Sequence, residues 1–270
     1  MNIHFTDKDF FEDLKAATLA KVRVGSHLYG TNNENSDEDF LYIYATSKAE
    51  LGSVFSTNHQ LQYKENNIDH NFVSLHQFIK NCINGDSPIN FEVIQSDELV
   101  GSDVEFLTVH QDYFRTYAII RSYNGLVKRD IKHYNKATTD YEKRKRLGHI
   151  VRGILYTHLL LDNNFNFKQA NLSFIQTQQK YAELDLDPRI VNPELQRLNS
   201  IAEEQRKLLN EKLDNGTLGY AKTMDVKGGV IITQDLQHLM NSLFFQVKQD
   251  KLKNFDLSYF IKAFENWVQY

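Results

Sequence analysis

The chain has 270 residues, 41% of them hydrophobic, which provides a packed core for one large domain or two modest ones and excludes global disorder. Lys and Arg number 31 against 35 Asp and Glu, so the net charge of −4 gives no overall attraction to nucleic acid. The single cysteine, Cys82, excludes an internal disulfide framework and fits a reducing compartment.

No apolar run reaches the roughly 20 residues that a membrane span needs. The first segment, MNIHFTDKDFFEDLK, contains acidic residues and has no long apolar core, so it does not resemble a signal peptide. We therefore expect a soluble, cytoplasmic protein with no membrane partner, and nothing in the sequence indicates an oligomeric state.

Short helices and short strands alternate in the first part of the chain. Apolar spacing predicts a helix over residues 10–19, a strand over 20–24, a helical turn over 26–29 and a strand over 40–45. The pattern continues with a hairpin of residues 60–63 and 67–73, a helix over 75–83, and a helix or short strand over 91–94. Residues 1–105 are therefore expected to form a mixed domain of helices and strands.

Helical periodicity dominates the rest of the chain. The predicted helices cover residues 106–120, 121–134, 140–161, 171–183, 192–213, 234–249 and about 259–268. Residues 106–270 are therefore expected to form an all-helical domain.

The pair Gly25-Ser26 directly follows an apolar strand. A glycine lets the backbone approach a ligand closely, and the N–H groups of a following helical turn favour phosphate oxygens. An ordinary strand-to-helix turn explains the same pair without any ligand.

Two aspartates, Asp37 and Asp39, begin the next apolar run. Because strand side chains alternate, a strand here points both aspartates to one face and Glu38 to the other. Magnesium prefers such hard oxygen ligands, usually carboxylates together with substrate phosphates. A polar loop that caps an element is the alternative interpretation of the same segment.

The combination of these segments is more specific than either part. GSHLYG at residues 25–30, followed by SDEDF at 36–40, resembles the signature of the DNA polymerase β-like nucleotidyltransferase superfamily. The resemblance implies an α+β fold, with a nucleotidyltransferase core (a short mixed sheet flanked by helices) followed by an all-helical domain. It also implies that Gly25 and Ser26 hold a triphosphate, and that Asp37 and Asp39 hold Mg²⁺ (or Mn²⁺).

A third acid usually lies on a later strand in this superfamily, and Asp69 is the candidate. The segment resembles the RNA-repair-associated nucleotidyltransferases of bacteria and phages, in which a strand acid precedes a Leu-x-x-Phe helix, here Leu75 and Phe78. The resemblance implies that Asp69 accepts the proton of the attacking hydroxyl or helps to hold a second metal ion. An exposed hairpin residue is the alternative, Glu65 is a rival third acid, and Glu92 is expected to have a structural or supporting role.

The segment KRLGHIVR, residues 145–152, resembles a helical K-R-x-x-H-x-x-R segment of the same family. Lys145, His149 and Arg152 share a helix face, and the resemblance implies that this face contacts the triphosphate. A basic solvent-exposed stripe with a buried His149 is the alternative. Lys128 and Lys132 are weaker candidates for phosphate contacts.

Two positions depart from the superfamily pattern, with His27 where arginine is common and Glu38 where an aliphatic residue is common. Neither departure removes a metal ligand. The resemblance implies Mg²⁺-dependent transfer of a nucleoside monophosphate from an NTP to a hydroxyl acceptor, such as an RNA or tRNA end, with release of pyrophosphate. The alternatives are a non-catalytic nucleotide- or RNA-binding module of the same fold, and a toxin–antitoxin-type enzyme that nucleotidylates a protein.

Overall fold

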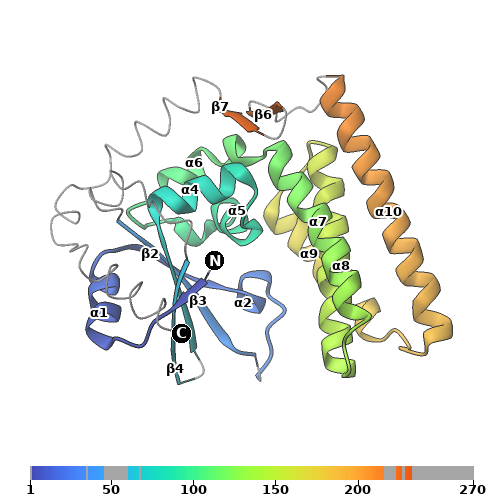
Figure 1. Cartoon of the computed structure of the whole chain (residues 1–270), viewed down its shortest axis with the longest axis horizontal. Coiled ribbons are helices and arrows are strands. Elements are labelled where there is room, and N and C mark those ends of the chain that lie inside the picture. Colours follow the sequence, from blue (N-terminus) through green and yellow to red (C-terminus); the bar gives the residue numbers. More distant parts are fainter. Residues whose placement is uncertain are drawn as a thin grey trace, which may run out of the picture. The chain divides into compact units, whose positions relative to one another are not determined.

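The computed structural model describes residues 2–34, 36–45, 60–66, 68–215, 223–226 and 229–232 (Figure 1). These residues form two compact units. Of the described residues, the first unit contains those up to 80 and 97–109, and the second contains 81–96 and those between 110 and 232. The contacts thus group the chain into interleaved units, whereas the single domain boundary after residue 105 remains a prediction.

A mixed five-stranded sheet, in the order β1-β4-β5-β3-β2, forms the centre of the first unit. Its strands are β1 (Asn2–His4), β2 (Thr18–Val24), β3 (Glu38–Tyr44), β4 (Gln60–Glu65) and β5 (Ile68–Ser74). β3 pairs antiparallel with β2 and parallel with β5, while β4 and β5 form an antiparallel hairpin. The structure confirms the predicted α+β fold class, with its short mixed sheet and helices.

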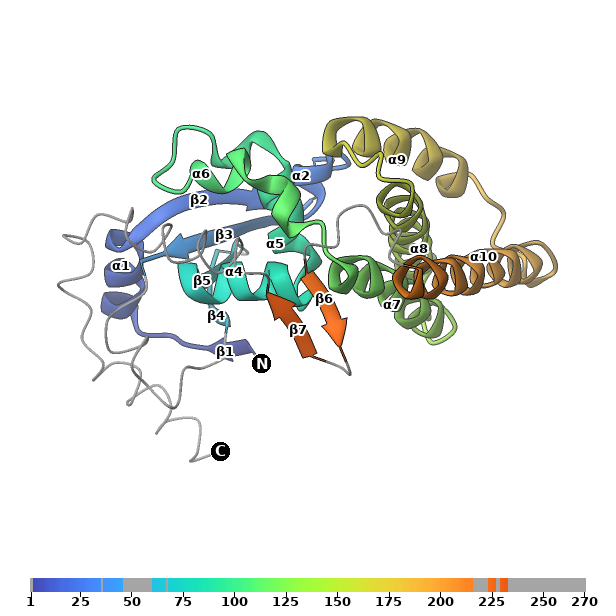
Figure 2. The ribbon, with the colours of Figure 1, turned by 90° about the horizontal axis from the view of Figure 1, so that it is seen from above.

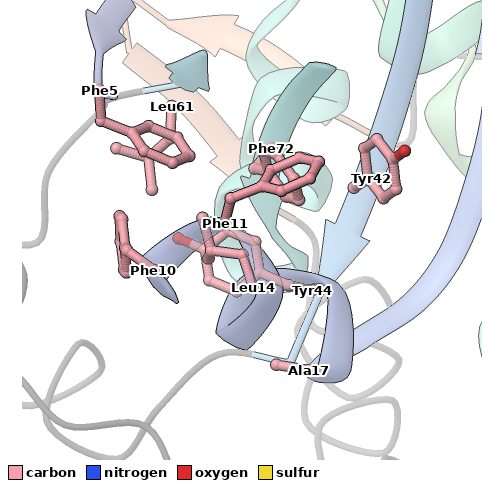
Figure 3. Close-up of a cluster of buried hydrophobic side chains, with 9 residues drawn as sticks. All are labelled: Phe5, Phe10, Phe11, Leu14, Ala17, Tyr42, Tyr44, Leu61 and Phe72. Atoms are coloured by element: carbon pink, nitrogen blue, oxygen red, sulfur yellow. The ribbon is translucent and has the colours of Figure 1, made fainter. Parts of the chain in front are cut away.

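One face of this sheet carries an aromatic layer beneath α1 (Lys8–Ala16), which Asp7 caps by accepting a hydrogen bond from the Phe10 N–H (3.1 Å). Figure 3 shows the cluster, whose members are Phe5, Phe10, Phe11, Leu14, Ala17, Tyr42, Tyr44, Leu61 and Phe72. A buried hydrogen bond joins the Tyr42 hydroxyl to His70 Nδ1 (3.0 Å). Burial, followed by the charge of Glu12, raises the pKa of Tyr42 to about 12, so the phenol stays protonated.

The remaining helices of the first unit are short. They are α2 (Ser26–Tyr29), η1 (Asp97–Leu99) and α6 (Phe106–Val109), and α4 (Leu75–Asn84) leads from the first unit into the second. The predicted continuous helix over residues 106–120 is wrong. A 3-10 turn, η2 (Gln111–Phe114), interrupts it, and Thr116 then caps a new helix by accepting a hydrogen bond from the Ile119 N–H (3.2 Å).

Five helices build most of the second unit. They are α5 (Pro88–Gln95), α7 (Tyr117–Tyr134), α8 (Asp140–Leu161), α9 (Phe167–Ala182) and α10 (Pro188–Asp214), and α7, α8 and α10 lie side by side in Figure 1. The predicted helix over residues 140–161 is confirmed. The next two helices begin earlier than predicted because Asn166 and Asp187 provide the N-caps.

A small antiparallel pair follows the helices, formed by β6 (Thr223–Val226) and β7 (Gly229–Ile232), as Figure 2 shows. The helices predicted over residues 234–249 and 259–268 lie outside the described residues. No helix in the described part of the chain combines the length and apolar character of a membrane span.

Helix α8 packs closely against α7 at Gly153. A Cβ atom at Gly153 would lie 2.7 Å from Val127 Cγ2 and 3.2 Å from the Tyr123 carbonyl oxygen. Real side chains do not come this close, so the packing of α8 on α7 depends on the missing side chain at this position.

We expect Gly153→Ala to destabilise the protein by about 1–3 kcal/mol, because the added methyl overpacks the helix interface. Gly125 is the matched control, since it lies in α7 and a Cβ there would meet no described atom within 4 Å. Gly125→Ala should stabilise the fold by about 0.5–1 kcal/mol through helix propensity. Urea unfolding of both variants measures the contrast, and equal effects would contradict this account of the packing.

Candidate active site

The short helix α2 lies between two glycines with positive φ. Gly25 has φ 67° and ψ −140°, and Gly30 ends α2 in the left-handed conformation at φ 69° and ψ 26°. Residues with a side chain adopt the Gly25 conformation only under strain. The Thr31 N–H donates to the Ser26 carbonyl oxygen (2.9 Å), which closes the turn. The predicted helical turn over residues 26–29 is confirmed.

The backbone of Gly25 also lies directly against a carboxylate. In the sheet register Val24 is the partner of Asp39, and a Cβ atom built on Gly25 would lie 2.7 Å from Asp39 Oδ2. A side chain at residue 25 would therefore displace this carboxylate. The absence of a side chain at Gly25 thus permits the turn and also leaves space for the Asp39 carboxylate.

Asp39 and Asp69 are brought together by the parallel pairing of β3 and β5. They are direct register partners near the first residue of each strand, on strands that lie about 4.8 Å apart. Partners in register project to the same face of a sheet, so the two carboxylates are neighbours. Two residues 30 positions apart in the sequence thus share one end of one face.

Asp37 stands just before β3, which begins at Glu38, and its side chain is exposed. Among the described residues, no three His, Cys, Asp or Glu side chains are grouped so as to hold a metal ion. The structure therefore places Asp39 beside Asp69 but does not close a three-carboxylate site with Asp37, whose metal-binding role remains a prediction.

The donors of the Asp39–Asp69 pair fit a hard divalent cation. Mg²⁺ binds proteins through oxygen atoms, commonly one or two carboxylates with substrate phosphates supplying other ligands. Two neighbouring carboxylates without a cation repel each other. The pair therefore suits a site that is completed by a phosphate-bearing substrate.

The two other acids near this end of the sheet project to the opposite face. Glu38 forms an ion pair with Arg23 on β2 (3.2 Å). Glu65 is the register partner of Ile68, so it alternates away from the face that carries Asp69. The register therefore favours Asp69 over Glu65 as the acid beside Asp39.

Lys64 is a residue of this site that the sequence analysis missed. It is the register partner of Asp69 on β4, and its Nζ lies 3.2 Å from Asp69 Oδ1. The predicted hairpin treated residues 64–66 as a turn, whereas β4 continues to Glu65. Extending the pairing of the two strands toward the turn would have identified Lys64 as the neighbour of Asp69.

His27 occupies the position at which arginine is common in the superfamily. Its Nε2 atom is buried, so this atom is not presented to solvent as a guanidinium would be. Ser26, beside it, is half-buried. Residue 27 is therefore a half-buried imidazole in place of the arginine of the superfamily pattern.

The basic residues predicted on α8 belong to the second unit, where they differ in environment. Lys145 is exposed, whereas the side chain of His149 is 30% exposed and that of Arg152 only 13% exposed. Arg152 Nε lies 3.9 Å from Glu92 Oε1, and the buried Glu92 carboxylate accepts a hydrogen bond from the Tyr123 hydroxyl (2.8 Å). Arg152 therefore contributes to a buried polar cluster of the helical unit.

His149 and Arg146 face a buried acid on α7, Asp130. Arg146 Nη1 lies 3.0 Å from Asp130 Oδ1, and His149 Nδ1 lies 3.8 Å from the same oxygen. Burial would raise the pKa of Asp130, but the interaction with His149 and the charges of Arg129 and Arg146 outweigh it and lower the pKa to about 2. Asp130 is therefore ionised at neutral pH.

Burial lowers the pKa of His149 below its ordinary value of 6.5, and the charge of Arg152 acts in the same direction against the attraction of Asp130. His149 is therefore neutral near pH 7. Lys128, a weaker candidate, forms an ion pair with Glu203 on α10 (2.6 Å), whereas Lys132 is exposed.

A mixed sheet with a glycine turn facing paired carboxylates defines a nucleotidyltransferase type of protein, and comparisons with known proteins identify the family. The model of the RNA repair pathway DNA polymerase beta family matches residues 8–254. The chain therefore belongs to this family.

Two further proteins are similar to the chain. An uncharacterized 38.9 kDa protein in the nrdC-mobD intergenic region of Enterobacteria phage T4 is 29% identical over 131 residues, covering 43% of this chain and 38% of the phage protein. The match thus spans well under two thirds of that relative. The crystal structure of a nucleotidyltransferase-like protein from Exiguobacterium sibiricum 255-15 aligns over 94% of this chain and 88% of its own, at 11% identity and a TM-score of 0.28.

We expect Gly25→Ala to be more damaging than the same change at another glycine with a positive φ. Gly101→Ala is the control, because Gly101 has φ +78° and a Cβ there meets no described atom within 4 Å. The control should lose about 1–2 kcal/mol of stability from backbone strain alone. Gly25→Ala should lose more, because φ 67° with ψ −140° is a conformation that essentially only glycine adopts and because Asp39 Oδ2 must also move aside. Chemical denaturation of both variants tests this, and equal losses would rule out the close approach.

Asp130→Asn should make the protein less stable at neutral pH, by on the order of 1–3 kcal/mol, because Arg129 and Arg146 lose the buried carboxylate that they contact. The folded pKa of about 2 lies below the ordinary 3.8, so the carboxylate stabilises the fold above about pH 4 and loses this effect as the pH falls through 2. The stability difference between wild type and variant should therefore shrink from pH 5 toward pH 2. Urea unfolding across this range measures it, and a constant difference would contradict the assigned pKa.

Proposed function

We propose that this protein transfers a nucleoside monophosphate from an NTP to a hydroxyl acceptor and releases pyrophosphate, with Mg²⁺ or Mn²⁺ as the cofactor. The observation that carries the proposal is the placement of Asp39 beside Asp69, with the side-chain-free backbone of Gly25 against the Asp39 carboxylate. Membership in the RNA repair pathway DNA polymerase beta family supports the same reaction class.

Asp39 and Asp69 would hold the divalent cation, with Asp37 as a further ligand at the start of the same strand. When bound, this cation supplies Lewis-acid stabilisation of the charge that develops on the phosphate oxygens. Gly25 and Ser26 would hold the triphosphate through the backbone of the turn and the serine hydroxyl. These roles use oxygen donors and a close backbone approach, which the turn and the strand register provide.

The chemical step forms one bond and breaks another at the α-phosphorus. The acceptor oxygen attacks the α-phosphorus, and the bond to the oxygen that bridges to the β-phosphorus breaks, so that pyrophosphate leaves. Asp69 accepts the proton of the acceptor hydroxyl. Its half-exposed carboxylate leaves it open to an incoming acceptor.

In this proposal Lys145, His149 and Arg152 contribute phosphate contacts from the helical unit. Lys145 is exposed and offers a positive charge, whereas His149 is neutral near pH 7 and offers only a hydrogen bond. Arg152 is largely buried near Glu92. Of the three, Lys145 is therefore the residue whose exposed positive charge can most readily contact a triphosphate.

The proposed acceptor is an RNA end, which the RNA repair pathway in the family description supports, and a tRNA end is the example that we propose to test. The two alternatives from the sequence are distinguished by where a label appears. Labelled protein instead of labelled RNA indicates a toxin–antitoxin-type enzyme. NTP binding without transfer to any acceptor indicates a non-catalytic binding module.

We expect Asp39→Asn and Asp69→Asn each to reduce transfer of label from α-labelled NTP by at least about a hundredfold, because each removes a carboxylate that faces the cation. The matched controls are Glu38→Gln on β3 and Glu65→Gln on the neighbouring strand β4, which neutralise acids that project to the opposite face. Both controls should keep nearly wild-type transfer.

The assay uses each of the four α-labelled NTPs with Mg²⁺ or Mn²⁺, and total RNA, purified tRNA and cell protein as acceptors. Transfer that survives both aspartate substitutions, or is lost equally in the glutamate controls, would overturn the assignment of the site.

A further inference from the structure

A row of charged side chains crosses three strands at the end of the sheet that holds the proposed site. Asp39 on β3, Asp69 on β5 and Lys64 on β4 are successive register partners, so they project to one face in that order. Lys64 Nζ lies 3.2 Å from Asp69 Oδ1. The row therefore contains two negative charges and one positive charge, with Asp69 between the other two.

The position of Lys64 matters because neighbouring carboxylates repel each other. An ammonium on the far side of Asp69 offsets part of this repulsion and fixes the Asp69 side chain. On the other side of Asp39 the row meets the backbone of Gly25. Lys64 is thus the charged partner that the register supplies on the β4 side of the pair.

The exposure of the ion pair determines how firmly Lys64 is held. The side chains of Lys64 and Asp69 are 64% and 46% exposed, so water screens their attraction and such pairs contribute little to stability. A long lysine side chain in solvent is released at small cost. The pair is therefore suited to reversible exchange, unlike the buried Asp130 carboxylate of the helical unit, which is only 1% exposed.

We propose that Lys64 is a positioning residue that acts as an exchangeable counter-ion of the Asp39–Asp69 pair. It holds Asp69 beside Asp39 in the metal-free protein and competes with a divalent cation for the Asp69 carboxylate. This inference rests on the proposed function, because it assumes that the two aspartates bind the cation.

The test measures metal binding without nucleotide or turnover, by titrating the full-length chain with Mn²⁺ and following free Mn²⁺ by electron paramagnetic resonance. Lys64→Met should bind Mn²⁺ about two- to fivefold more tightly than wild type, a ratio set by the strength of an exposed ion pair. Lys64→Arg keeps the charge and should bind as wild type does.

Lys21→Met is the control for the loss of one positive charge. Lys21 lies on β2 and projects to the opposite face, where its Nζ is 3.9 Å from the centre of the Phe40 ring. The affinity of this variant for Mn²⁺ should stay near the wild-type value. A gain in affinity as large as that of Lys64→Met would show a nonspecific charge effect and overturn the inference.

The remaining outcomes separate this inference from the proposed function. If wild type binds Mn²⁺ and Asp39→Asn abolishes binding, while Lys64→Met binds equally or more weakly, Lys64 is a structural partner in the hairpin and only this inference fails. If wild type binds no Mn²⁺, both the metal site and the role of Lys64 are overturned. Tighter binding in Lys64→Met alone supports both.

Discussion

The cross-strand register between β3 and β5 is the constraint on which the site depends. Parallel pairing sets Asp39 opposite Asp69, and a slip of one residue would place a carboxylate opposite an aromatic side chain and turn one acid to the other face. The aromatic layer under α1 opposes such a slip, because Tyr42 and Phe72 are register partners whose rings stack at 4.5 Å. Burial on one face thus fixes the positions of charged groups at the end of the other.

The end of the sheet that holds Asp39 and Asp69 has two features that are unfavourable for stability. Two carboxylates lie side by side, and Gly25 has a conformation that other residues avoid. Sites that break local rules in this way are expected where function is selected over stability. The positive charge of Lys64 reduces the repulsion between the two carboxylates. The missing side chain at Gly25 leaves space for the Asp39 carboxylate.

In the helical unit two acids are buried, unlike the half-exposed Asp69. These acids, Asp130 and Glu92, each lie near an arginine of α8, at 3.0 Å for Arg146 and 3.9 Å for Arg152. Removing one member of a buried pair leaves the other charge uncompensated, so substitutions here affect stability first. Activity measurements on these residues therefore need a parallel measurement of folding, whereas a substitution of the exposed Lys145 tests the proposed phosphate contact with less effect on the core.

The sequence by itself determined the features that depend on neighbours in the chain. The turn at Gly25-Ser26, the projection of Glu38 away from the face of Asp39, and the helix over residues 140–161 follow from alternation, periodicity and caps. The family followed as well, because the two short motifs have a specific spacing, and the family comparison confirms it.

Only the tertiary structure decided which distant residues meet. The sequence left Asp69 and Glu65 as rivals and gave Lys64 no role, because the choice depends on where the β4–β5 pairing ends. It predicted a shared basic face on α8 but not the buried acids opposite it, since Asp130 and Glu92 come from other helices. Hydrogen-bond register and helix packing join residues far apart in the chain, and no local pattern contains that information.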